Sequence, residues 1–345
     1  MSLCKWNLLV VFMLAVCAIG VPAFNVVTDP YGVFHMGWKH DSPAFDERYL
    51  KVEHLIEHPG KHNAFILGSS MMGAFDPVVM NIATPGLSWY NLSFLGGTPK
   101  ESLDALTALS RRGIIPKQVL VGIDFFPFRQ DSAGEDSPSR YPHPLVTGEH
   151  PLLWYRHFLF ASSFWTGALR VISEHSALPD IHFDIDGGGR YRLVKQENEM
   201  AADPAGYAKR HLPHAEDAKA GGSEVAWVEG RFEDLAILVA WLKAHNVEAR
   251  YFIHPFNHRL LDSVSKRSMG EFRARIQSIT GPLADFSKDD GITRDDLNYF
   301  DTKHYTQKVA NTIVAQMLGD EVNPKAGGVV ALNAAHLAKQ AFTLH

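Results

Sequence analysis

The chain has 345 residues, a formal net charge of -5 and a pI near 6.4. Nucleic-acid binding needs a basic surface, which this balance does not provide, so we expect no nucleic-acid partner. Hydrophobic residues make up 46% of the chain, enough for the core of one enlarged domain or of two. Both cysteines, Cys4 and Cys17, lie in the N-terminal apolar segment, which excludes disulfides and cysteine metal sites in the rest of the chain.

The N-terminal segment predicts a membrane anchor. Residues 8–21 contain no polar side chain, and extension to residue 27 gives the length of about 20 residues that a membrane-spanning helix needs. Lys5 on the short N-terminal side favours a cytoplasmic N-terminus and an exported body. A cleaved signal peptide is the alternative, with Val21-Pro22-Ala23 as a cleavage site. We therefore divide the chain into an anchor or signal peptide (1–27), a main domain (28–318) with an insertion at about 129–222, and a tail (319–345).

Short apolar runs alternate with amphipathic stretches along the main domain. We expect strands at residues 64–67, 78–83, 118–125, 249–253 and 283–286. The run 118–125 is apolar without interruption from Val119 to Ile123, as in a strand that is buried on both faces of a parallel sheet. These elements predict an α/β fold, a three-layer α/β/α sandwich with a mainly parallel five-stranded sheet. A loop is expected at 85–97, followed by a helix from Thr98, where Thr98 and Glu101 suit a capping box. Further helices are expected at 154–172, 224–245 and 260–280, and a last one that residues 301–304 open.

A serine follows the first expected strand. Gly68, Ser69 and Ser70 form a tight turn between that strand and a helix start. Ligands of open α/β sheets bind beyond the carboxyl ends of the strands, so Ser70 would face the expected site. A glycine-serine turn without chemistry is the alternative.

An aspartate and a histidine follow the last expected strand. Asp301 and His304 are three residues apart at the expected start of the last helix, so both can face the same strand ends. Serine is a weak nucleophile until a base takes its proton, and the base works best when a third group fixes its tautomer. We therefore predict Ser70 as nucleophile, His304 as base and Asp301 as the group that orients the base.

In these motifs the chain resembles the SGNH (GDSL-type) serine hydrolases. Gly68-Ser69-Ser70 stands where that family has Gly-Asp-Ser, and Asp301-x-x-His304 matches its terminal block. Segments 29–34, 91–97 and 121–125 resemble the membrane-anchored branch that includes the D-alanyl transfer protein of teichoic acid synthesis and periplasmic alginate O-acetylation proteins. The resemblance covers about residues 25–318, with gaps.

The resemblance implies further site residues. Gly96 and Gly97 precede a helix N-terminus, where backbone N–H groups favour an anion, and Gly97, or secondarily Gly96, would donate to the oxyanion. A tight loop that needs glycine is the alternative. Asn91 begins the same matching segment and is a candidate substrate contact. Asp124 stands where the wider family has asparagine, so a third oxyanion donor is not expected.

The loop after the fourth expected strand contains His254, Asn257 and His258. Two histidines four residues apart suit a metal on a helix, but Pro255 and Phe256 favour a loop. We therefore expect no metal and no cofactor. The resemblance makes Asn257 and His254 candidate substrate contacts instead.

The insertion predicts a lid or a surface for a glycan acceptor. Its glycine-rich part is neither a phosphate loop nor a calcium loop, because the required partner residues are missing. Its aromatic side chains are candidates for a sugar platform, and core positions are the alternative: Trp154, Tyr155, Phe164 and Trp165.

Three functional hypotheses follow. The first is an extracytoplasmic serine O-acyltransferase that moves an acyl group, in the first place acetyl, onto a cell-surface or exported glycan. For it the resemblance implies a membrane-bound O-acyltransferase partner. The second is an esterase or deacetylase with the same triad. The third is a non-catalytic scaffold that binds glycan or recruits the transferase. In each case we expect the main domain on the outer side of the cytoplasmic membrane.

Overall fold

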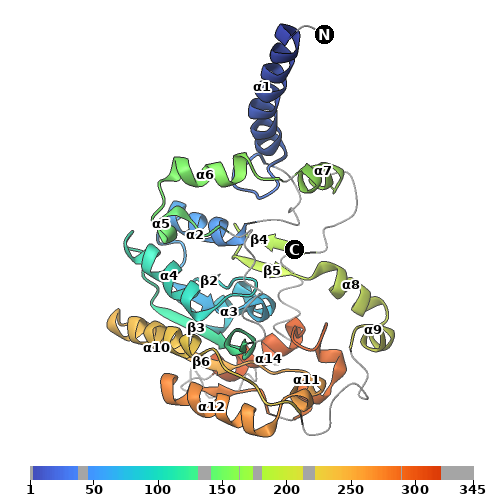
Figure 1. Ribbon diagram of the computed structural model, residues 1–345. Coiled ribbons are helices and arrows are strands. Elements are labelled where there is room, and N and C mark those ends of the chain that lie inside the picture. The colour runs from blue at the N-terminus through green and yellow to red at the C-terminus, as the bar shows by residue number, and fades with distance from the viewer. Residues whose placement is uncertain are drawn as a thin grey trace.

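The computed structural model describes residues 3–37, 46–130, 141–162, 164–173, 181–212, 222–288 and 290–319. Its centre is a five-stranded sheet of parallel strands in the order β2-β1-β3-β6-β7. The strands are β1 (Ala64–Leu67), β2 (Trp89–Asn91), β3 (Gln118–Ile123), β6 (Glu248–Ile253) and β7 (Ala284–Asp285). Helices flank the sheet (Figure 1), so the predicted α/β/α sandwich is confirmed.

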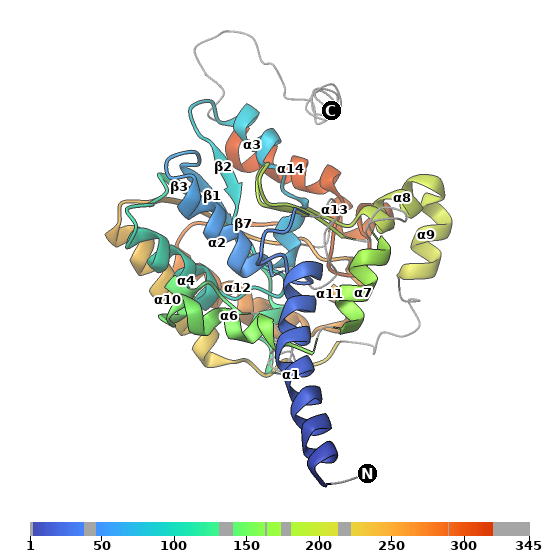
Figure 2. The ribbon, with the colours of Figure 1, turned by 90° about the horizontal axis from the view of Figure 1, so that it is seen from above.

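The two faces of the sheet have separate groups of helices. On one face α4 (Pro99–Ser110) and α12 (Lys266–Thr280) both contact α10 (Glu229–Ala244), and on the other α3 (Pro77–Ala83) contacts α14 (Gln307–Leu318) (Figure 2). The continuously buried strand β3 lies between β1 and β6, as its apolar sequence requires. The predicted tail from residue 320 lies outside the described residues.

The second predicted strand is wrong. Residues 78–83 belong to helix α3, because Asp76 caps its N-terminus by accepting a hydrogen bond from the Val78 N–H and Pro77 occupies the first turn. Val79, Met80 and Ala83 are buried at helical spacing. The sheet still has five strands, because β2 takes the place of the wrongly predicted one, and β2 lies inside the segment predicted as a loop.

The helices differ from the predictions mainly at their ends. α4 begins with the predicted capping box of Thr98 and Glu101. The helix expected at 260–280 is divided into α11 (His258–Ser263) and α12, because Ser265 caps a new N-terminus. The stretch 154–172 likewise forms α6 (Pro151–Leu159) and α7 (Phe164–Ser173). Asp301 and His304 precede α14 rather than open it.

The remaining elements complete the main domain. α2 (Glu47–Glu57) packs against α4. The insertion contributes an antiparallel hairpin of β4 (His182–Asp184) and β5 (Arg190–Arg192). The other helices are α5 (Pro144–Thr147), α8 (Val194–Ala202), α9 (Pro204–His211), α13 (Gly291–Arg294) and the 3-10 helices η1 (Ser70–Ala74), η2 (Phe126–Phe128) and η5 (Asp296–Asn298).

The N-terminal helix α1 (Leu3–Thr28) projects from the body (Figure 1). Its segment Lys5–Thr28 is long and apolar enough to cross a membrane, by length and composition. The segment 29–34, directly after α1, packs against the body: the ring of Tyr31 lies edge-on against Phe158, and the ring of Phe34 stacks on Tyr155.

Candidate active site

The turn after β1 presents Ser70 at the carboxyl end of the sheet. Gly68 has φ 143°, a backbone conformation that favours glycine. A Cβ at Gly68 would lie only 2.7 Å from the carbonyl oxygen of Gly122 on the neighbouring strand. Ser69 then caps η1 by accepting a hydrogen bond from the Met71 N–H, and Ser70 is the first residue of that helix.

Three predicted side chains form one hydrogen-bonded chain. The hydroxyl Oγ of Ser70 lies 2.9 Å from Nε2 of His304, and Nδ1 of the same ring lies 2.7 Å from Oδ2 of Asp301. The second carboxylate oxygen of Asp301 accepts hydrogen bonds from the backbone N–H groups of Lys303 and His304, both at 2.7 Å. Serine, imidazole and carboxylate therefore have the connectivity of a nucleophile, a base and an orienting group.

The carboxylate of Asp301 is held in its charged form. Burial acts to raise its pKa, but the hydrogen bond and charge of His304 and the two backbone N–H groups outweigh burial and lower the pKa to about 2. Asp301 is therefore ionised at neutral pH. It can stabilise the imidazolium that forms when His304 takes a proton.

The neighbouring Ser69 has a different role. Its hydroxyl donates a hydrogen bond to Oδ2 of Asp124, whose Oδ1 accepts from the Phe126 N–H. Both Ser69 and Asp124 are buried, and burial raises the pKa of Asp124. Because the Ser69 hydroxyl is directed into the protein, only Ser70 of the two serines is hydrogen-bonded to His304.

In the segment 91–97 the structure engages two of the predicted donors, Gly97 and Asn91, in hydrogen bonds within the protein, and Gly96 stays a prediction. The Gly97 N–H donates to the carbonyl of Phe94 at 2.9 Å, and Gly96 lies in an exposed turn with φ 61°. Asn91 is completely buried, and its amide donates to the carbonyls of Met72 and Phe75. Asn91 therefore stabilises η1 from inside the protein and does not face a substrate.

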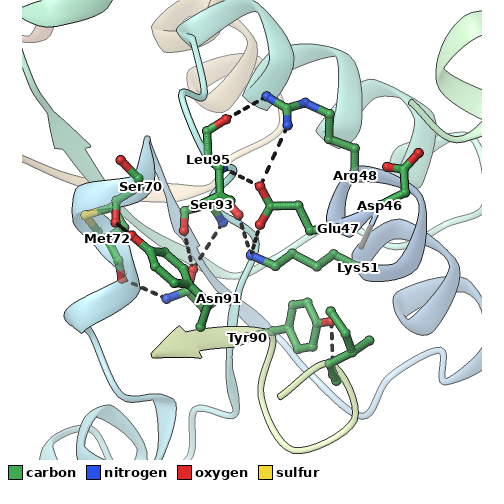
Figure 3. A network of polar contacts seen from close by, with 12 residues as sticks. Asp46, Glu47, Arg48, Lys51, Ser70, Met72, Tyr90, Asn91, Ser93 and Leu95 are labelled. Atoms are coloured by element: carbon green, nitrogen blue, oxygen red, sulfur yellow. Dashed lines mark hydrogen bonds and ion pairs between the residues drawn. The ribbon is translucent and has the colours of Figure 1, made fainter. Parts of the chain in front are cut away.

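A buried charged network on α2 holds the same loop (Figure 3). Lys51 is fully buried, donates to the carbonyl of Ser93 and lies 3.4 Å from a carboxylate oxygen of Glu47. The other oxygen of Glu47 accepts from the Leu95 N–H, and Arg48 donates to the Leu95 carbonyl at 3.0 Å. Burial lowers the pKa of Lys51, against the opposing effect of Glu47. Sequence reasoning missed this network.

The two other candidate contacts are structural as well. Asn257 is fully buried and caps α11, and its backbone N–H donates to the carbonyl of Thr302, beside Asp301. His254 is also fully buried and shares a 2.7 Å hydrogen bond with the Tyr305 hydroxyl. Both therefore support the Asp301–His304 loop from inside and do not face solvent.

The insertion supplies site residues that the sequence did not reveal. A pocket beside Ser70 and His304 is lined on its other side by the hairpin residues Arg190, Tyr191 and Arg192. The Tyr191 hydroxyl donates to the Ser70 carbonyl. A Cβ on Gly73, in η1, would lie 2.0 Å from the Tyr191 ring, so glycine is needed there.

The triple glycine before this hairpin has a packing role. The carbonyl of Gly188 accepts a hydrogen bond from the Asn91 N–H, and Gly189 has φ 75°. A Cβ on Gly189 would lie 2.5 Å from the Asn91 carbonyl oxygen. The glycines thus let the insertion approach the edge strand β2 closely. The run of three glycines was the only feature of the sequence that indicated this contact.

Trp154 in the insertion is completely buried and stacks on Tyr49, so it belongs to the core and cannot form a sugar platform.

No family model and no curated protein matches the chain.

Buried His254 predicts that the protein loses stability in mild acid. Burial, together with the charge of His304, lowers its pKa to about 3. The unfolded chain takes up this proton near pH 6.5, whereas the folded protein does not until about pH 3. As the pH falls from 6.5 to 3, His254 should therefore lower the free energy of unfolding by about 1.4 kcal/mol per pH unit.

In the variant His254→Gln, the free energy of unfolding should depend less steeply on pH in this range, by about 1.4 kcal/mol per pH unit, because one titrating group is removed. Urea unfolding between pH 7 and pH 4 measures the slope for both proteins. Equal slopes in the two proteins would mean that His254 is protonated in the folded state.

Proposed function

We propose that the protein is a serine O-acyltransferase that forms an acyl-enzyme on Ser70 and passes the acyl group to a glycan hydroxyl. The observation that carries this proposal is the continuous hydrogen-bonded chain from Ser70 through His304 to Asp301. The likeness of the motifs around Ser70 and His304 to SGNH serine hydrolases, and to their membrane-anchored branch, supports the same reaction class.

Each of the three hydrogen-bonded residues has one chemical task. Oγ of Ser70 attacks the carbonyl carbon of the acyl donor while Nε2 of His304 takes the hydroxyl proton. The tetrahedral intermediate collapses to an ester on Ser70, and the leaving group departs with the proton from His304. A glycan hydroxyl then loses its proton to His304 and attacks the carbonyl carbon of this ester, and the bond to Oγ of Ser70 breaks as His304 returns the proton to Oγ. Asp301 keeps the imidazole in the required tautomer.

The pocket beside Ser70 suits a hydroxyl-rich acceptor. Beside apolar side chains, its lining includes three polar ones that can donate to or accept from sugar hydroxyls, namely Arg192, Glu197 and Gln307. The N-terminal helix supports a site at a membrane surface, and we place the body on the outer side of the cytoplasmic membrane, where exported glycans are modified. A membrane-bound O-acyltransferase that delivers acyl groups is the partner that fits this arrangement.

Hydrolysis of acyl esters is the second candidate. The side chains of His304 and Asp301 are 25% and 48% exposed, so water reaches the base. Water at about 55 M competes with every acceptor, and a transferase succeeds only by orienting its acceptor at the ester.

Donor turnover with and without an acceptor separates the two reactions. We expect the full-length protein in lipid nanodiscs to consume a small aryl acetate slowly. An added oligosaccharide should accelerate consumption and become acetylated, as detected by mass spectrometry, and Ser70→Ala should do neither. Fast turnover that no oligosaccharide changes would identify an esterase.

A further inference from the structure

The helices α6 and α7 expose an unusual number of large apolar side chains. The exposed fractions are 76% for Leu152, 51% for Leu153, 62% for Phe160, 77% for Trp165 and 61% for Ile172. Soluble surfaces seldom gather such side chains without a binding partner.

These helices lie where α1 leaves the body. Both views place α6 and α7 on opposite sides of the base of α1 (Figures 1 and 2), and both helices contact α1. Exposed apolar side chains on α1 extend to Val27, whereas Asn25 and Thr28 in the same last turns are buried. From Lys5 to Phe24 the helix rises about 30 Å, which equals the thickness of a bilayer's hydrocarbon core. The two helices therefore lie at the depth where the apolar span ends.

Specific contacts fix α6 and α7 to α1. The side-chain amide of Asn25 donates to the carbonyls at the end of α6, those of Phe158, Leu159 and Ala161, at 3.0 to 3.1 Å. On α7, Gly167 is buried against α1, and a Cβ there would lie 2.5 Å from Oγ1 of Thr28. The position of both helices relative to α1 is thus set by close packing.

α6 has one face buried against the body and one face exposed. Trp154 and Phe158 are buried beneath it, whereas Leu152 and Arg156, about one turn apart on α6, are exposed, as is Phe160 directly after its end. An outward face that combines apolar side chains with an arginine is typical of helices at the headgroup level of a membrane.

We propose that α6 and α7 lie in the interface of the membrane that α1 crosses, with their outward apolar side chains in contact with lipid. Together with α1 they give the body three attachments, which fix its orientation on the bilayer. A lipid occupant is favoured because the apolar face continues the apolar surface of α1 at the depth where that span ends. The proposal rests on α1 crossing the membrane and is independent of the chemistry at Ser70.

Lipid quenching of single fluorescent labels tests the proposal without reference to activity. In the full chain with Cys4→Ser and Cys17→Ser, single cysteines are introduced as Leu152→Cys, Trp165→Cys or Ile172→Cys and labelled with a polarity-sensitive dye. The protein is placed in nanodiscs of phosphatidylcholine and phosphatidylglycerol. Lys243→Cys, exposed on α10 at the far side of the body, is the aqueous control, and Val11→Cys is the control for α1.

We expect lipids with a spin label near the headgroup to quench dyes at positions 152, 165 and 172 several-fold more than the dye at position 243. Quenching equal to that at position 243, with a water-exposed emission, would overturn the proposal. A blue-shifted emission without lipid quenching would overturn it in favour of a protein partner on this face. If the dye at position 11 is not quenched by deeply placed labels, α1 does not cross the bilayer and the proposal fails with it.

Discussion

We expect Ser70→Ala, His304→Ala and Asp301→Ala each to lower turnover of an acyl ester by a factor on the order of 10⁴ to 10⁶. The reason is the single hydrogen-bonded chain: Ser70 cannot lose its proton without His304, and His304 loses its tautomer and its stabilising charge without Asp301. Because the three act as one unit, a double variant such as Ser70→Ala with His304→Ala should lose no more than the worse single variant.

Thermal unfolding controls for a general loss of structure. All three side chains lie in loops or at an element start and are partly exposed, so each variant should keep the unfolding temperature of the wild type within a few degrees. Multiplicative losses in the double variants would contradict a common catalytic unit.

The second large effect concerns stability. We expect Lys51→Met to lower the free energy of unfolding by about 3–5 kcal/mol, because it leaves the buried carboxylate of Glu47 without its closest cationic partner. The same change releases the Ser93 carbonyl, so the loop that leads to Gly97 loses one of its restraints. Urea unfolding at pH 7 measures the loss.

An exposed pair of the same spacing is the matched control. Lys100 and Asp104 are also four residues apart on a helix, at 2.6 Å, but their side chains are 56% and 36% exposed. Lys100→Met should therefore change the free energy of unfolding by no more than about 0.5 kcal/mol. The double variant Glu47→Gln with Lys51→Met should recover much of the loss. A loss for Lys51→Met as small as that for Lys100→Met would exclude a stabilising role of the network.

The elements that sequence reasoning predicted correctly have local causes. The capping box at Thr98 and the apolar run of β3 are determined by neighbours within a few residues, and both are present in the structure. Residues 78–83 were misassigned because their apolar side chains suit either a buried strand or a short helix. The deciding signals, Asp76 and Pro77, precede the run. Strand β2 was missed because it is three residues long and is defined by its pairing with β1.

The same distinction applies to the site. Ser70, Asp301 and His304 could be predicted because a tight turn and a three-residue spacing place side chains at the strand ends. Asn91, at the end of β2, and His254 and Asn257, after β6, also lie at strand ends, but their burial depends on packing between distant segments. The contact of Tyr191 with Ser70 joins residues 121 positions apart, and no local pattern encodes it. Only the glycines before the hairpin indicated a close approach.

Labelling with a fluorophosphonate probe tests the central claim, that Ser70 is the nucleophile activated by His304, most directly. Such a probe bonds covalently to a serine hydroxyl that an adjacent base has activated, and peptide mass spectrometry identifies the modified residue. The hydroxyl of Ser70 lies 2.9 Å from the His304 ring, whereas that of Ser69 donates to buried Asp124. The wild type and Ser69→Ala should be labelled on Ser70, and Ser70→Ala and His304→Ala should not be labelled. Labelling that persists in Ser70→Ala, or that is found on Ser69 in the wild type, would contradict the assignment.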